Sequence, residues 1–124
     1  MLLVKAKRGR SRINGDGLIA REFIAKGSAV WRFEAAVDRK FTVSDVARLP
    51  HKEAQEVLYF AFFDREGDVF VLSGDDDRFT NHSSRPNTRF TDRLETVATR
   101  DIRPGAEITW DYLEIEMRRP RTNE

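Results

Sequence analysis

The hydrophobic residues of this chain form short runs that are separated by polar positions. Most of these runs end at glycine, proline or charged turn residues. This pattern is typical of short, half-buried β-strands rather than of long amphipathic helices. Turns that contain glycine are expected at Arg12–Gly17, at Lys26-Gly27 and at Arg65–Asp68, where the last would close a hairpin. We predict strands at Leu2–Ala6, Leu18–Arg21, Ala29–Phe33, Val69–Leu72, Phe90–Thr91 and Thr96–Thr99.

The middle of the chain carries the helical signal. Thr42 precedes Asp45 by three residues, as in a capping box, and Pro50 suits the first position of a second helix because its φ is fixed. The aromatic run Tyr59–Phe63 predicts a strand that leaves this second helix. Apolar residues recur before it at helical spacing, at Ala54, Val57 and Leu58. The predicted fold class is therefore mainly β with one small helical insert.

Composition narrows the range of functions. A length of 124 residues predicts a single domain over residues 1–124. The sequence has no cysteine, which excludes disulfides, thiolate nucleophiles and cysteine-based zinc sites, and its two histidines are His51 and His82. We therefore expect no metal site. The formal net charge of +1 creates no strong field, so we expect no direct nucleic-acid partner.

The hydropathy pattern also bears on location. No apolar run approaches the roughly 20 residues that a membrane-spanning helix needs. The apolar start Met1–Val4 is followed at once by basic residues, which is the reverse of the order in a secretory signal. We expect a cytoplasmic protein with no membrane partner.

Two polar segments carry the candidate chemistry. The first, Arg78–Asn87, reads Arg-Phe-Thr-Asn-His-Ser-Ser-Arg-Pro-Asn, and the second, Ile102–Tyr112, ends in Trp-Asp-Tyr. Each alone is compatible with a polar turn beside a strand. Their order and separation resemble the two signature segments of the SET-domain lysine methyltransferases. The resemblance implies an enzyme that transfers a methyl group from S-adenosylmethionine to the side-chain amine of a protein lysine.

This reaction needs a deprotonated lysine amine, whose unperturbed pKa is about 10.4, held in line with the methyl donor. An apolar, aromatic channel disfavours the ammonium form, and a phenol can orient the amine without being readily methylated. The resemblance assigns this catalytic role to Tyr112. The alternative interpretation is a buried tyrosine at a strand end whose hydroxyl is satisfied structurally.

The resemblance also assigns cofactor binding to Asn81 and His82, without proton transfer by the imidazole. Read alone, an Asn-His pair in a loop is usually a turn. Upstream, Gly15, Asp16 and Gly17 form a Gly-x-Gly turn, which the resemblance places at the amino-acid end of the cofactor, where glycine allows the backbone to come close. It is not a Rossmann fingerprint, because it lacks a third glycine and a following helix.

Aromatic residues complete the expected site. Tyr59 would contact the cofactor or line the lysine channel, with core packing as an equally weighted alternative. Trp110 stands where family members carry Phe or Tyr, which predicts a crowded substrate channel, and Phe79 would pack beneath the site. The acidic triplet Asp75–Asp77 is expected to be a solvated turn rather than a cation site.

The resemblance covers about residues 12–112 and implies a β-clip-like fold of several small sheets with a threaded, knot-like C-terminal segment. The chain departs from many members at Ser84, in place of a cysteine, and at Ala106, in place of a glutamate. The cysteine-rich segment that often closes the lysine channel has no counterpart in residues 113–124. Either these residues or a second subunit would have to close the channel, which leaves a homodimer open.

Two other functions are alternatives. A SET-like module could have lost turnover and bind only a peptide or protein partner, as the absent closing segment suggests. A small basic nucleic-acid binder would rest on the clusters Lys5–Arg12 and Arg118–Arg121. The sequence leaves open which protein carries the lysine and how many methyl groups are added.

Overall fold

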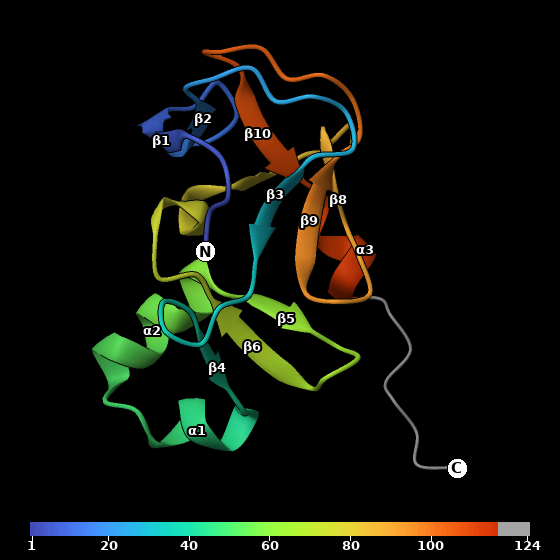
Figure 1. Ribbon diagram of the computed structural model, residues 1–124. Coiled ribbons are helices and arrows are strands. Elements are labelled where there is room, and N and C mark those ends of the chain that lie inside the picture. The colour runs from blue at the N-terminus through green and yellow to red at the C-terminus, as the bar shows by residue number, and fades with distance from the viewer. Residues whose placement is uncertain (117–124) are drawn as a thin grey trace.

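The computed structural model describes residues 1–116, and residues 117–124, which include the Arg118–Arg121 cluster and most of the predicted closing tail, lie outside the described part. Three small sheets carry the fold, with short helices between and beside them (Figure 1). The helices are α1 (Val43–Arg48), α2 (His51–Phe60), the 3₁₀ helix η1 (Asp76–Phe79) and α3 (Tyr112–Glu116). The strands are β1 (Ala6–Arg10), β2 (Asp16–Ala20), β3 (Ala29–Arg32), β4 (Arg39–Phe41), β5 (Phe62–Asp64), β6 (Val69–Leu72), β7 (Asn81–His82), β8 (Thr88–Phe90), β9 (Glu95–Ala98) and β10 (Glu107–Trp110).

Each sheet joins segments that are distant in the sequence. The first has the order β1-β2-β10-β7, the second β3-β9-β8 and the third β4-β6-β5. An aromatic core lies where the sheets meet, with Phe62 in edge-to-face contact with Trp31 and Trp110, and Trp110 stacked on Phe90. Such ring pairs contribute about 0.5–1.5 kcal/mol each beyond the area that they bury. Tyr112 packs against this core at its edge.

Several sequence predictions are confirmed. The capping box of α1 is present, because the Thr42 hydroxyl accepts from the Asp45 N–H at 3.0 Å and the Asp45 carboxylate accepts from the Thr42 N–H at 2.8 Å. The strands predicted at Ala29–Phe33 and Val69–Leu72 correspond to β3 and β6. The hairpin turn between β5 and β6 also forms, with Asp68 at a φ of 57°.

Other element predictions are wrong. The first strand begins at Ala6 rather than Leu2, which forms only an isolated bridge to Trp31. The strand predicted at Tyr59–Phe63 is split: Tyr59 and Phe60 complete α2, and β5 begins at Phe62. Packing overrides the strand preference of the aromatic residues, since the helix lets Phe60 contact Phe79 edge to face at 5.5 Å. Pro50 caps α2 instead of occupying its first turn.

The loop after β7 holds β10 in place through the side chain of Asn87, which is buried. Its Oδ1 accepts from the Thr109 N–H at 2.8 Å, and its Nδ2 donates to the Glu107 carbonyl at 2.9 Å. Thr88 adds a hydroxyl bond to the Thr109 carbonyl at 2.6 Å. Two buried side chains thus satisfy the backbone of β10 as a neighbouring strand would, which fixes the strand that leads into Tyr112.

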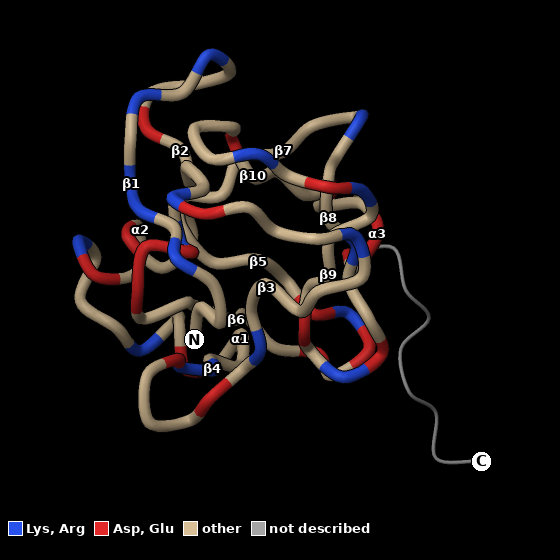
Figure 2. Tube along the Cα trace, turned by 45° about the horizontal axis from the view of Figure 1, so that its top comes forward, with Lys and Arg blue, Asp and Glu red and all other residues tan. Residues whose placement is uncertain are grey.

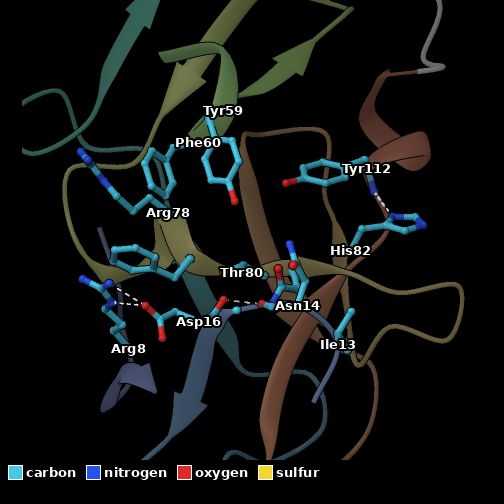
Figure 3. Close-up of a pocket in the computed structure, with 13 residues that line it drawn as sticks. Arg8, Ile13, Asn14, Asp16, Tyr59, Phe60, Arg78, Thr80, His82 and Tyr112 are labelled. Atoms are coloured by element: carbon cyan, nitrogen blue, oxygen red, sulfur yellow. Dashed lines mark hydrogen bonds and ion pairs between the residues drawn. The ribbon is translucent and has the colours of Figure 1, made fainter. Parts of the chain in front are cut away.

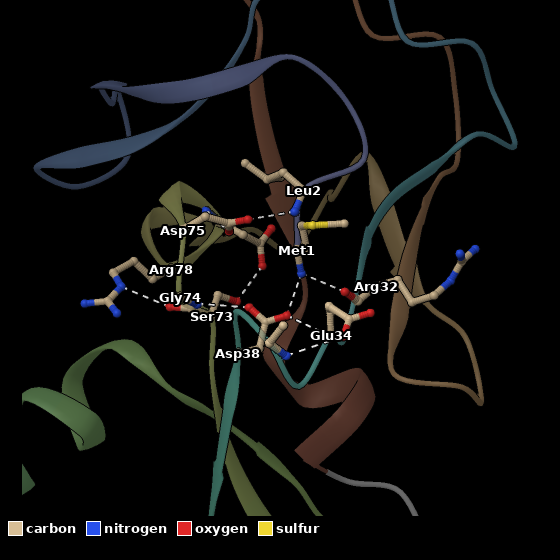
Figure 4. Close-up of polar contacts among 11 residues, drawn as sticks. Met1, Leu2, Arg32, Glu34, Asp38, Ser73, Gly74, Asp75 and Arg78 are labelled. Carbon is tan, nitrogen blue, oxygen red and sulfur yellow. Dashed lines mark hydrogen bonds and ion pairs between the residues drawn. The ribbon is translucent and has the colours of Figure 1, made fainter.

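A polar network joins the N-terminal residues to the segment that precedes β7 (Figure 4). The buried Asp38 carboxylate accepts from the Glu34 and Gly74 N–H groups, both at 2.9 Å, and from the Met1 nitrogen. Asp75 accepts from the Leu2 N–H at 2.8 Å. These bonds anchor the beginning of η1.

The solvated turn expected at Asp75–Asp77 is a wrong prediction. Asp77 lies in η1 with 2% of its surface exposed, and its Oδ2 accepts from the Ser73 hydroxyl at 2.9 Å. Burial raises the pKa of Asp77 to about 7, the Ser73 bond opposes this rise, and the negative charge of Asp75 adds to it. The triplet begins a 3₁₀ turn whose Asp75 side chain accepts from the Asp77 N–H, so its third carboxyl points inward.

The raised pKa of Asp77 predicts a pH-dependent stability. Because the folded state binds this proton more tightly than the unfolded chain, the contribution is full below pH 4 and is lost as pH rises through about 7. Asp77→Asn removes this titration. The free energy of unfolding of the variant, relative to that of the unmodified chain, should therefore rise by about 2 kcal/mol as pH increases from 5 to 8. Urea unfolding across this range, with exposed Asp92→Asn as the charge-matched control, measures the gain. An equal pH dependence in both variants would contradict it.

Candidate active site

A pocket of about 510 Å³ opens between the glycine turn at Arg12–Gly17, the end of α2 and the segment from η1 to β7. Figure 3 shows Tyr59 and Tyr112 directed into it from opposite elements, α2 and α3. Of the predicted site residues, the structure brings Gly15, Asp16, Tyr59, Asn81, His82 and Tyr112 into its lining. The remaining lining residues are Arg8, Ile13, Asn14, Phe60, Arg78, Phe79 and Thr80.

The pairing of β7 with β10 explains why the two signature segments meet. The strands run parallel, with Asn81 aligned to Thr109 and His82 to Trp110. The Ser83 N–H continues the pairing by donating to the Trp110 carbonyl at 2.8 Å. Since Tyr112 lies two residues beyond Trp110, this register brings it beside His82 at the rim of the pocket.

The side-chain amide of Asn81 joins β7 to the glycine turn. Its Nδ2 lies 3.1 Å from the Asn14 carbonyl and 3.0 Å from the Asp16 carbonyl. The Ser11 hydroxyl, at 3.0 Å, and Glu107 Oε2, at 3.1 Å, are also within hydrogen-bond distance. The amide has only two N–H bonds for these four acceptors. It therefore holds the glycine turn through several neighbouring acceptors rather than through a single contact.

Glu107 was not predicted as a site residue, yet it determines the shape of the turn. Its carboxylate accepts from the Ser11 hydroxyl at 2.8 Å and lies directly over Gly17. A Cβ on Gly17 would come within 2.5 Å of Oε2 of Glu107, so only glycine allows this approach. Gly15 has a different requirement, a φ of 48°. Gly17 itself is outside the pocket lining. Its contact with the cofactor stays a prediction.

Tyr112 begins α3 with its ring held between other rings. The His82 imidazole is parallel to it, with ring centroids 5.7 Å apart and an interplanar angle of 3°, and Trp110 tilts against it at 5.7 Å. The buried indole N–H of Trp110 makes no hydrogen bond within residues 1–116. Burial raises the pKa of the Tyr112 phenol. The hydroxyl is therefore neutral at physiological pH and acts as a polar group, not as a phenolate.

An aromatic wall with two arginines faces Tyr112 across the pocket. Arg8 lies over the Phe79 ring at 4.5 Å and pairs with Asp16, while Arg78 lies over Phe60 at 5.6 Å. Phe79 therefore lines the pocket itself, whereas the prediction placed it beneath the site. Tyr59 is 71% exposed and is not a core residue, so the alternative of core packing is wrong for it. Acidic and basic residues are otherwise interspersed along the trace (Figure 2).

Trp110 lies in the aromatic core beside the pocket rather than in its lining. Its surface is only 1% exposed. Its contact with the site is indirect, through the face that it presents to Tyr112. A direct role in the substrate channel stays a prediction.

Two general features of the described residues bear on the type of site. Across residues 1–116, His, Asp and Glu side chains form no group of three that could hold a metal ion. Over the same range no helix combines the length and apolar character needed to cross a bilayer. The walls of the pocket carry aromatic, cationic and amide groups.

The sequence model of the SET domain family matches residues 15–113, which are most of the chain. The chain therefore belongs to the SET domain family. Its sequence is similar to that of the H3 lysine-36-specific histone-lysine N-methyltransferase of Debaryomyces hansenii, with 28% identity over 116 residues and 83% of this chain covered. The chain spans only 15% of the length of that relative.

Solved structures show the same fold. The Neurospora SET-domain protein DIM-5, a histone lysine methyltransferase, superposes with a TM-score of 0.63 at 22% identity, over 90% of this chain and 53% of that one. A candidate histone methyltransferase of Plasmodium falciparum gives 0.64 at 17% identity, over 90% and 95%. A mutant Polycomb Repressive Complex 2 of Chaetomium thermophilum gives 0.68 at 21% identity, over 90% and 15%. The predicted class, mainly β with several small sheets and few helices, is confirmed.

The close approach of Gly17 and Glu107 yields a test by double-mutant cycle. Gly17→Ala should lower the free energy of unfolding by about 1–3 kcal/mol, because the new methyl displaces the carboxylate from Ser11 and Asn81. In a Glu107→Ala background the same substitution should cost much less, since the clashing group is absent. Urea unfolding of the four proteins measures the coupling. An equal cost in both backgrounds would show that the close approach does not constrain the turn.

Proposed function

We propose that this chain transfers a methyl group from S-adenosylmethionine to the side-chain amine of a lysine in a protein. The observation that carries the proposal is the convergence of Asn81 and Tyr112, from the two signature segments, on one pocket in a member of the SET domain family. The names of the similar proteins, which are histone lysine methyltransferases, support the same reaction class. A lysine-containing protein is the proposed substrate.

The residues of the pocket fit S-adenosylmethionine. Its volume is within the range of about 300–1,000 Å³ that is usual for small-molecule sites. The cofactor joins an adenine ring, a cationic sulfur and a zwitterionic amino acid, and it supplies the methyl group. The aromatic wall offers faces to a ring and to a cation, and Arg8, Arg78 and Asp16 offer charges of both signs. Gly15, Gly17, Tyr59, Asn81 and His82 complete the proposed cofactor site.

Tyr112 is the proposed catalytic residue. Its neutral hydroxyl can accept a hydrogen bond from the lysine amine and hold the nitrogen lone pair in line with the methyl group. Loss of water in a channel beside Tyr112 disfavours the ammonium ion and promotes loss of the amine proton to solvent before attack. The raised pKa of the phenol argues against proton removal by a phenolate.

Closure of the lysine channel belongs to the same proposal. Leu113, which follows the catalytic position, is 56% exposed, and Tyr59 across the pocket is 71% exposed. An apolar cover over these two side chains would complete a channel. Closure by residues 113–124 or by a second copy of the chain stays a prediction, because residues 117–124 lie outside the described part. The alternative of a module without turnover is not favoured, because Asn81 and Tyr112 are both retained.

The two tyrosines of the sequence provide a matched test of the catalytic assignment. Tyr112→Phe keeps the ring packing but removes the hydroxyl, so kcat should fall by about 100-fold or more while cofactor affinity changes little. Tyr59→Phe should affect cofactor or peptide binding more than kcat. Transfer from labelled S-adenosylmethionine to a panel of histones and other basic proteins gives the rates, and calorimetry gives cofactor affinity.

Two outcomes would contradict the function. The first is an unmodified chain that binds the cofactor but labels no lysine in any protein of the panel, which would favour the binding-module alternative. The second is a Tyr112→Phe variant with an undiminished kcat, which would remove the phenol from the mechanism.

A further inference from the structure

The side chain of His82 has contacts that cofactor binding does not explain. Its Nδ1 accepts a hydrogen bond from the backbone N–H of Tyr112 at 3.2 Å, and its ring lies parallel to the phenol (Figure 3). The same Nδ1 is 3.5 Å from Oδ1 of Asp111. One nitrogen thus faces both a donor and an acceptor, immediately beside the proposed catalytic residue.

The Tyr112 N–H belongs to the first turn of α3. The first N–H groups of a helix have no partner within the helix and need one from outside. Asp111 supplies two, because its Oδ1 accepts from the Leu113 N–H at 2.9 Å and its carbonyl accepts from the Glu114 N–H at 3.2 Å. His82 supplies the third, for Tyr112. The imidazole is therefore part of the cap that sets where α3 begins and where the phenol points.

The charge of the imidazole decides which partner Nδ1 can take. An imidazole nitrogen accepts an N–H bond only while it carries no proton, so the contact with Tyr112 requires the neutral form with its proton on Nε2. Protonation at Nδ1 places two donors face to face and gives that nitrogen an attractive partner in the Asp111 carboxylate. The two states therefore hold the start of α3 differently.

We propose that His82 is a positioning residue that couples its own protonation to the placement of the Tyr112 phenol. The neutral imidazole holds the phenol in the pocket through the Tyr112 N–H and the stacked ring. The protonated imidazole turns toward Asp111 and releases Tyr112. The proposal rests on the proposed function for its effect on methyl transfer, whereas the coupling between the two residues is a property of the fold itself.

The groups around the imidazole favour such a switch. On the α3 side it faces the carboxylates of Asp111 and Glu116 and the neutral phenol of Tyr112. Burial raises the pKa of Glu116, and the charge of His82 opposes that rise, so the two side chains interact. The other charged and titratable groups of the same pocket are Tyr59 on α2, Arg78 on η1, and the paired Arg8 and Asp16. The imidazole is 41% exposed, so solvent reaches it.

A pH titration by NMR tests the coupling without any assay of activity. We expect the backbone amide resonance of Tyr112 to shift with the same midpoint as the ring of His82 between pH 5 and pH 8, the range in which histidine changes charge. Asp111→Asn should move both midpoints to lower pH together, because it removes a carboxylate that stabilises the cation. Exposed His51 is the internal reference, and His51→Asn should leave the Tyr112 shift intact.

Activity then separates positioning from general damage. His82→Asn places an amide oxygen near the position of Nδ1, where it can accept from Tyr112 but cannot be protonated. Its kcat should fall much less than that of His82→Ala, for which we expect about a tenfold or greater loss at pH 8. The pH profile of kcat should lose its lower step in His82→Asn, and the step that remains belongs to the lysine amine.

The outcomes distinguish this proposal from the proposed function. A Tyr112 amide that does not follow the titration of His82, or a lower step that persists unchanged in His82→Asn, overturns the positioning role even if methyl transfer is active. Conversely, coupled NMR midpoints in a protein without methyl transfer support the positioning role and count against the proposed reaction.

Discussion

The parallel pairing of β10 with β7 is the constraint on which the site depends. It aligns Asn81 with Thr109 and His82 with Trp110, and so brings together segments that are about 30 residues apart. The other side of β10 is fixed by Asn87, whose buried side chain satisfies two backbone groups of the strand. A strand held on both sides cannot slip by one residue without turning its side chains to the opposite face. The direction of Tyr112 follows from that register.

The same packing sets the state of the Tyr112 phenol. Tyr112 is partly buried against the aromatic core, which keeps its phenol neutral, and its backbone N–H donates to Nδ1 of His82. Asn81, Ser11 and Glu107 form a second polar group that fixes the glycine turn on the opposite wall. One wall thus presents an uncharged hydroxyl, and the other presents a rigid backbone with charged side chains beside it. This division suits the proposed methyl transfer, in which the amine must be neutral and the donor is a cation.

The sequence predicted those parts of the molecule whose signals are local. Val69–Leu72 and the Thr42 capping box could be identified because a hairpin turn and cap spacing act over a few residues. The resemblance located Asn81 and Tyr112, which the fold brings to one pocket. It gave no signal for Glu107, because its partner Gly17 is 90 positions away in the sequence and becomes a neighbour only through the pairing of β2 with β10. The prediction for Asp77 is wrong for a similar reason. Three consecutive acidic residues indicate a solvated turn, and only the folded structure shows that the third one is buried.

A crystal structure with S-adenosylhomocysteine, the demethylated cofactor, tests the central claim most directly. The account predicts that the product occupies the pocket between Asn81 and the aromatic wall. Its sulfur should face the hydroxyl of Tyr112, and an opening on the far side of the sulfur should admit a lysine side chain. A product bound elsewhere, or a sulfur turned away from Tyr112 with no opening beside it, would contradict the account.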